Sequence, residues 1–198
     1  MNKIYDCAYF DHWYRDPSRQ QEIEQHLKRK VNLALAQAEY YLGYPPRTVL
    51  DVGCGEGVWR EALLAIDPKI RYLGLDSSEY AIERYGRERN LHLVSFGDLA
   101  ELRFEEPVDL LVCADVMHYI PERELERGLS GFAELCDGVA WLEAYCTEDA
   151  VEGDHEGYLE RDAAWYRQRF ATAGFRACGS HCYLSPERHE EAMALEFQ

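Results

Sequence analysis

The chain has 198 residues, 47% of them hydrophobic and 29% charged, and a formal net charge of −16 at pH 7. That composition is typical of one globular domain with a buried core. The acidity argues against a nucleic-acid partner, which needs a basic surface to displace counterions. No apolar run approaches the roughly 18 residues of a transmembrane helix, so no membrane contact is expected. A signal-peptide pattern is missing, and the seven cysteines do not have the spacing of a disulfide framework. We therefore expect reduced thiols and a cytoplasmic location.

The first 47 residues are predicted to form a helical cap on the rest of the chain. Tyr5, Tyr9 and Trp13 recur every four residues, which places them along one face of a helix. That aromatic face would be either a flap that closes over a ligand or the ordinary packing of a first helix. A long helix is predicted over residues 18–42, between a proline and a glycine.

A glycine-rich turn follows the first predicted strand, in the sequence Val49-Leu50-Asp51-Val52-Gly53-Cys54-Gly55-Glu56-Gly57. An amphipathic helix is predicted directly after it, over residues 58–66. Glycines let a ligand lie against peptide N–H groups, and the helix N-terminus adds a partial positive charge. A nucleotide-type cofactor site is therefore expected. The dinucleotide fingerprint would require a further glycine where Val58 stands.

Acidic residues recur near the ends of the next predicted strands. Strands over 71–75, 91–96 and 108–113 are followed by Asp76, by Gly97-Asp98 and by Ala114-Asp115. Open α/β sheets bind ligands at these strand ends, and a carboxylate can accept two hydrogen bonds from vicinal hydroxyls. The alternative is helix capping, which is a common use of Asp or Ser after a strand.

The remaining segments complete an α/β pattern. Helices are predicted over 78–89, 121–136 and 163–173, strands over 139–144, 175–184 and 192–197, and a long loop over 145–162. The expected fold class is a doubly wound, Rossmann-like α/β fold with helices on both faces. Its mainly parallel sheet would end in a C-terminal antiparallel hairpin, and one domain would span residues 1–198, with residues 1–47 as the cap and 48–198 as the core.

The run Cys178-Gly179-Ser180-His181-Cys182 has the residue types of a metal site. On an extended strand its two cysteines would lie roughly 13 Å apart, and His181 would point to the opposite face. No metal site is therefore expected there.

In order and in content, these motifs resemble those of the class I S-adenosylmethionine-dependent methyltransferases. The resemblance extends from about residue 40 to about residue 175. It implies that S-adenosylmethionine is the cofactor and that a C-terminal hairpin closes the sheet. It also implies a set of cofactor contacts: Gly53, Cys54, Gly55 and Gly57 beside the methionine moiety, Asp51 bracing that loop, Asp76 at the ribose, Ser77 near the adenine, Asp98 and Leu99 at the adenine, and Ala114 near the sulfonium.

The sequence offers two candidates for catalysis just after the fourth strand. His118 could act as a general base, since imidazole titrates near neutrality, or it could merely pack beneath the next helix. Asp115 could bind an acceptor amine, orient His118 or cap a helix. Glu143 and Tyr145 are weaker candidates for the acceptor pocket. No metal is expected, because the Asp-Asn pair that metal-assisted members of the family carry at the next strand end is absent, and Glu143-Ala144-Tyr145 stands there instead.

The sequence therefore predicts a methyltransferase that acts on oxygen or nitrogen of a small-molecule acceptor. Two alternatives stay open at this stage. One is a protein methyltransferase whose acidic loop, Glu148–Glu160, recruits a basic polypeptide. The other is a non-catalytic scaffold subunit that binds S-adenosylmethionine. Nothing in the sequence indicates an oligomeric state.

Overall fold

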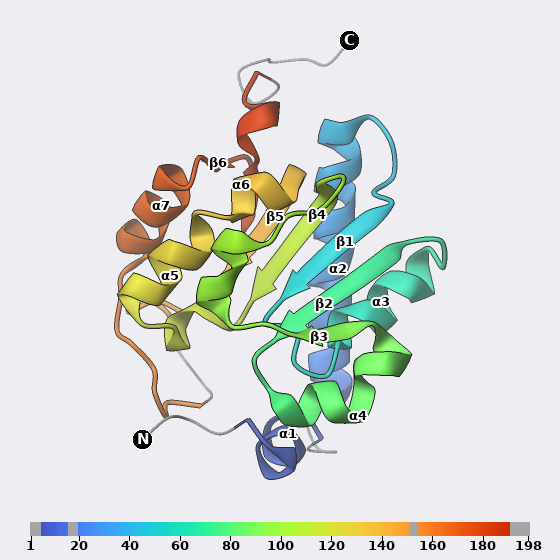
Figure 1. Cartoon of the computed structure of the whole chain (residues 1–198), viewed down its shortest axis with the longest axis vertical. Helices are drawn as coiled ribbons and strands as arrows, with labels where there is room; N and C mark the ends of the chain where they lie inside the picture. The colour runs from blue at the N-terminus through green and yellow to red at the C-terminus, as the bar shows by residue number, and fades with distance from the viewer. Residues whose placement is uncertain (1–4, 16–19, 151–153, 191–198) are drawn as a thin grey trace.

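A computed structural model of the chain describes residues 5–15, 20–150 and 154–190. They form one seven-stranded sheet in the order β3-β2-β1-β4-β5-β7-β6 (Figure 1). The strands are β1 (Thr48–Val52), β2 (Arg71–Asp76), β3 (Leu91–Leu93), β4 (Val108–Ala114), β5 (Cys136–Glu143), β6 (Arg176–Ala177) and β7 (Cys182–Leu184). The helices are α1 (Cys7–Tyr14), α2 (Gln20–Leu42), α3 (Val58–Ile66), α4 (Glu79–Arg89), α5 (Glu122–Leu129), α6 (Phe132–Leu135) and α7 (Ala163–Thr172). Short 3-10 turns are η1 (Phe96–Glu101), η2 (Met117–Tyr119) and η3 (Pro186–Arg188).

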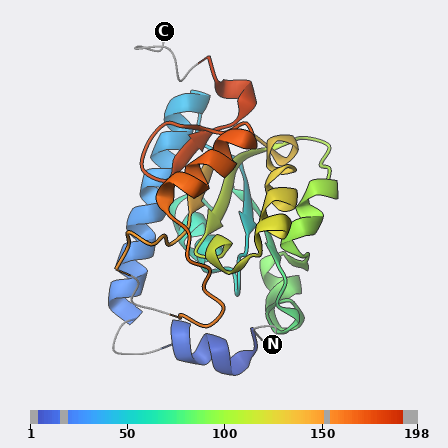
Figure 2. The same cartoon turned by 90° about the vertical axis from the view of Figure 1, so that its left-hand side faces the viewer.

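Helices cover both faces of the sheet, and each face has its own apolar core. The side chains of β1, β4 and β5 alternate between the two, as the period of two along a strand requires. Leu111 and Leu142 pack toward α5, α6 and α7, whereas Val112 and Trp141 pack toward α2 and α3. In Figure 2, α2 and α5 lie on opposite sides of the sheet. The predicted doubly wound α/β fold is confirmed.

Strand order reverses direction at β1, which pairs in parallel with β2 on one side and with β4 on the other. The chain leaves β1 toward one face and leaves β4 toward the other, so a crevice opens beyond the carboxyl ends of these two strands. The α1 helix lies beyond this end of the sheet (Figure 1). None of the described helices is both long enough and apolar enough to span a membrane.

Several predicted elements have different bounds in the structure. The third strand ends at Leu93 instead of Phe96, because the chain turns into η1 and carries Asp98 with it. The helix expected over 121–136 is interrupted at Ser130-Gly131, and the fifth strand already begins at Cys136. Ser78 caps α4, since its hydroxyl accepts a hydrogen bond from the Ala81 N–H at 3.1 Å.

The expectation of one extended strand over 175–184 is wrong. The segment is a tight hairpin in which the Cys178 N–H donates to the Cys182 carbonyl at 2.9 Å, and β7 runs antiparallel to both β5 and β6. His181 adopts φ +57° in the turn, where its ring packs on Trp141. The separation of the two cysteines argued from an extended strand therefore does not apply. The strand predicted over 192–197 and the start of the helix predicted at 18 lie outside the described residues.

Candidate active site

The glycine loop is bent back onto the end of β2. The N–H groups of Gly53 and Cys54 both donate to the Leu75 carbonyl, at 2.8 and 3.1 Å. Gly53 and Gly55 have φ of +72° and +52°, a conformation that side chains disfavour. A Cβ at Gly53 would also meet Val116 at 2.7 Å. The sequence Gly-x-Gly thus lets the chain pass between β2 and the segment after β4.

Asp76 ties this loop to the start of α4. One carboxylate oxygen, Oδ2, accepts from the Gly55 N–H and the other, Oδ1, from the Ser78 N–H, both at 2.7 Å. Burial raises the pKa of Asp76, and the two backbone donors oppose that rise. An ionised carboxylate has about four acceptor positions, so two stay available for a ligand.

Asp51 lies beneath the loop and is 2% exposed. Its Oδ2 accepts a 2.7 Å hydrogen bond from the hydroxyl of Tyr72, which is itself buried. Burial raises the pKa of Asp51 to about 7, although the Tyr72 hydrogen bond acts in the other direction. Burial and the neighbouring Asp51 carboxylate likewise raise the pKa of the Cys54 thiol. The two side chains support the loop from below.

A cleft opens at the carboxyl ends of β1, β2 and β4. Seven of the residues selected from the sequence line it: Gly53, Gly55, Asp76, Ser77, Leu99, Ala114 and Asp115. Val94, Phe96 and Leu99 form an apolar wall next to Asp76 and Ser77. The cleft thus joins a polar end at the glycine loop, an apolar slot and the strand end at Ala114.

The N-terminal segment covers one side of this cleft. Tyr5, Tyr9 and Phe10 line it, and a Cβ on Gly55 would lie 3.1 Å from the Phe10 ring. The segment is fastened to the start of α4, where the Ser78 hydroxyl donates to the Tyr5 carbonyl at 2.7 Å, and to the glycine loop, where Arg15 pairs with Glu56 at 2.5 Å. Tyr5 and Tyr9 therefore have the position of the flap that the sequence raised as one alternative, while Trp13 does not line the cleft.

Comparison with known proteins identifies what the core of the chain is similar to. Residues 49–137 match the family model described as a methyltransferase domain. The chain is 30% identical to trans-aconitate 2-methyltransferase of Pseudomonas paraeruginosa over 159 residues, which is 79% of this chain and 50% of that protein. It is 31% identical to malonyl-[acyl-carrier protein] O-methyltransferase of Legionella pneumophila over 111 residues, or 51% of this chain and 39% of that protein.

The core of the chain, residues 49–137, matches the methyltransferase-domain family, and the fold is that of the class I S-adenosylmethionine-dependent methyltransferases. Solved structures agree in fold: a methyltransferase of Archaeoglobus fulgidus has a TM-score of 0.63 at 16% identity, covering 85% of this chain and 73% of that one. Magnesium protoporphyrin IX methyltransferase of Synechocystis, solved with S-adenosylhomocysteine, has a TM-score of 0.58 at 19% identity, covering 81% and 76%. The chain spans half or less of the length of the curated relatives it matches.

Five of the residues selected from the sequence do not line the cleft: Asp51, Cys54, Gly57, Asp98 and His118. The first two support the loop from below, and Gly57 is the N-cap residue of α3. Asp98 is largely exposed, accepts from the Ser95 hydroxyl at 2.5 Å and lies 3.6 Å from Arg127. Its neighbour Leu99 faces the cleft instead, because the 3-10 turn of η1 separates the directions of adjacent side chains.

His118 is buried behind the cleft and is only 2% exposed. Its ring packs against Tyr119, Tyr145 and Tyr158, at centroid distances of 4.2, 5.3 and 5.7 Å. Its Nδ1 accepts a 3.4 Å hydrogen bond from the Tyr145 N–H. A base must reach the proton that it removes, and this position fits the packing alternative for His118 better than the catalytic one.

An ion-pair cluster joins α2 to the ends of β4 and β5. Lys30 Nζ lies 2.6 Å from Glu143 Oε1 and 3.4 Å from Asp115 Oδ2, and the other Glu143 oxygen accepts from Trp141 Nε1 at 2.9 Å. Burial by itself lowers the pKa of Lys30, but the carboxylates of Asp115 and Glu143 outweigh it and raise that pKa. The sequence had selected the two acids, but nothing in the periodicity of the long helix marked Lys30.

Asp115 has an unusual backbone for a residue that is not glycine. Its φ is +59°, and its N–H donates to the Glu143 carbonyl at 3.1 Å. Left-handed conformations of such residues cost free energy and cluster at functional sites.

Among the described residues, no three His, Cys, Asp or Glu side chains converge as metal ligands.

Proposed function

We propose that the protein transfers the methyl group of S-adenosylmethionine to an oxygen or nitrogen atom of a small-molecule acceptor. The observation that carries this proposal is the convergence of the glycine loop, Asp76 and Ala114 in one cleft at the reversal of strand order. The names of the curated relatives support it, since they are methyltransferases of trans-aconitate, malonyl-[acyl-carrier protein] and ubiquinone biosynthesis.

The cleft has the chemistry that the cofactor needs. Asp76 keeps acceptor positions for two ribose hydroxyls, and its existing bonds to Gly55 and Ser78 hold the carboxylate in place. The apolar side chains of Val94, Phe96 and Leu99 suit a flat adenine ring. Gly53 and Gly55 leave the backbone bare for the methionine end. We assign Ser77 to the adenine and ribose side, and Asp51, Cys54 and Gly57 to shaping the loop.

Asp98 differs from the other residues assigned to the adenine, because its side chain lies outside the cleft. Its carboxylate points to Ser95 and Arg127 and does not line the cleft. An adenine contact from Asp98 is therefore a prediction that Asp98→Ala would test. Phe96 and Leu99 carry the stronger assignment.

When bound, S-adenosylmethionine supplies a methyl group on a sulfonium, which is a good leaving group. What the protein must add is alignment of the acceptor atom with that methyl group and exclusion of water. Ala114 and Asp115 lie at the end of β4, which is the acceptor side in this assignment. Tyr9 and Phe10 would close the cleft from the N-terminal segment.

The acidic loop gives little support to a basic polypeptide as acceptor. The carboxylate of Glu148 accepts from the Ala163 N–H at 3.1 and 3.3 Å, which places it at the start of α7. Asp149 accepts from the Cys146 N–H at 2.9 Å. Both charges thus stabilise local backbone.

A thermal-shift series with S-adenosylmethionine, S-adenosylhomocysteine, NAD and ATP tests the cofactor. A ligand at about 100 times its dissociation constant adds roughly 2.7 kcal/mol to the free energy of unfolding. For a chain of this size the midpoint should rise by about 5–10 °C with the two adenosyl compounds. A rise with NAD alone, or no rise with any of the four compounds, would overturn the cofactor assignment.

A further inference from the structure

We propose that the methyl acceptor is a basic amine, which Asp115 binds as a cation beside the rings of Tyr9 and Tyr119. This inference rests on the proposed methyl transfer and adds the chemical class of the acceptor. The names of two relatives specify O-methylation. For this chain, the choice between an oxygen and a nitrogen acceptor is argued from the charge of the cleft.

The described lining of the cleft carries only negative formal charge. Its ionisable acids are Asp76, Asp115 and Glu124, and no lysine, arginine or histidine lines it among the residues that the structure describes. A carboxylate or phosphate acceptor would therefore be desolvated next to like charge, which is costly. An amine cation meets the opposite situation.

Lys30 cannot act as the missing positive charge. Its Nζ lies 2.6 Å from Glu143 and 3.4 Å from Asp115, and its side chain is 14% exposed. One positive and two negative groups leave a net charge of −1. Glu143 uses both oxygens, for Lys30 and for Trp141, so the remaining charge belongs to Asp115. No hydrogen bond to Asp115 Oδ1 is found within the described ranges.

The position of Asp115 is held before any acceptor arrives. Its left-handed backbone is tied to β5 through the Glu143 carbonyl, and its Oδ2 is near Lys30. A fixed carboxylate binds a cation with little loss of side-chain entropy. This arrangement explains why a strained residue stands at the end of β4, next to Ala114.

Aromatic rings complete the surroundings of a cation. Tyr5, Tyr9 and Tyr119 line the cleft together with Asp115, and the Tyr119 hydroxyl donates to the Asp154 carbonyl at 2.9 Å. Burial, together with the nearby carboxylates of Asp76 and Asp154, raises the pKa of Tyr5 to about 12, so its ring carries a neutral hydroxyl. The faces of such rings attract cations by about 0.5–2 kcal/mol.

The chemistry balances without another reactant. The bound ammonium first gives a proton to the Asp115 carboxylate, whose pKa is raised by burial and by Glu143 despite Lys30, and from there the proton passes to water. The freed nitrogen lone pair then forms the bond to the methyl carbon as the carbon–sulfur bond breaks, and that electron pair stays on sulfur. The positive charge moves from sulfur to the methylated nitrogen.

Matched small molecules test the charge preference in the complex with saturating S-adenosylhomocysteine. The probes are choline, its uncharged carbon isostere 3,3-dimethylbutan-1-ol, and the anion 3,3-dimethylbutanoate, with affinities measured by ligand-observed NMR. We expect choline to bind about tenfold more tightly than the alcohol, and the anion to bind weakest. Asp115→Asn should reduce choline affinity about tenfold and leave the alcohol unchanged.

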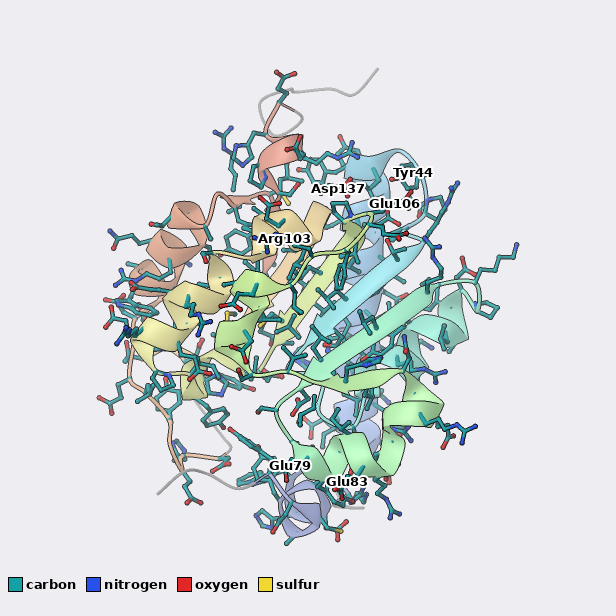
Figure 3. All side chains as sticks on the ribbon, in the orientation of Figure 1. Tyr44, Glu79, Glu83, Arg103, Glu106 and Asp137 are labelled. Atoms are coloured by element: carbon teal, nitrogen blue, oxygen red, sulfur yellow. The ribbon has the colours of Figure 1, made fainter. Side chains whose placement is uncertain are left out.

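The control is Glu106→Gln, the same acid-to-amide change at an exposed residue just before β4 and therefore at the opposite end of the sheet, as Figure 3 shows. It should change none of the affinities. Equal binding of choline and the alcohol, tighter binding of the anion, or binding of none of the probes would overturn the amine acceptor. Each of these results leaves the proposed methyl transfer standing as long as S-adenosylhomocysteine binds; a failure of S-adenosylhomocysteine itself would overturn the proposed function.

Discussion

Asp76 shapes the glycine loop, and in the proposed function it also binds the ribose of the cofactor. Its two oxygens hold the N–H groups of Gly55 and Ser78. Asp76→Ala should weaken S-adenosylhomocysteine binding by about 1–3 kcal/mol, because charge-assisted bonds to the ribose and the loop are lost together. Calorimetry measures the affinity. Asp67→Ala is the control, since Asp67 makes the same bond to the N–H two residues on, at 2.9 Å, but stands after α3. Equal affinities of the two variants would refute the ribose assignment.

Asp51 makes stability depend on pH. Burial raises its pKa from 3.8 to about 7, so between those values the folded state binds more protons than the unfolded state. Its contribution is fully present below pH 3.8 and is lost as the pH rises through 7. Between pH 5 and pH 8 the free energy of unfolding should fall by about 2–3 kcal/mol from this group.

Asp51→Asn isolates that contribution, because an amide oxygen can still accept from Tyr72 but does not titrate. Urea unfolding at pH 5 and pH 8 should show a variant that gains stability relative to wild type at the higher pH. A difference between the two proteins that is independent of pH would contradict the buried titration.

At the scale of elements, Lys30 and Glu143 connect α2 to β5. The Glu143 carboxylate is mostly buried, and Lys30 is the only cation that pairs with it among the described residues. Lys30→Met should therefore lower the free energy of unfolding by about 3 kcal/mol. Adding Glu143→Gln should recover part of this loss, since the uncharged amide can still accept from Trp141 Nε1. Urea unfolding of the two single variants and the double variant measures the coupling. Strictly additive losses would show that the two side chains act independently.

Elements also differ in how well local pattern predicts them. The strand, glycine turn and helix over 48–66 match expectation, because hydrophobic runs and glycines act within a few residues. The hairpin of β6 and β7 does not, because its turn is stabilised by packing of His181 on Trp141 of a distant strand. Ser130-Gly131 likewise interrupts a helix that periodicity extends without a break.

For the whole molecule, the net charge of −16 predicts a response to salt. Screening reduces the repulsion among the excess acids, and it weakens surface pairs such as Arg127–Glu101 and Arg169–Glu122 only slightly, because exposed pairs contribute little. The thermal midpoint should therefore rise between low and physiological NaCl concentration. A midpoint that falls would mean that ion pairs outweigh the net repulsion.

The sequence by itself determined the α/β class, the glycine loop and the acids at the strand ends, since these depend on local periodicity and on residues that must follow a strand. Only the tertiary structure decided which of them meet. It brought Asp76 and Ala114 into one cleft with Tyr5 and Tyr9, turned Asp98 outward and buried His118 behind Tyr119. It also placed Lys30 beside Asp115, across 85 residues of chain. Contacts between distant elements depend on packing and on the charges that burial forces together, and no local pattern records them.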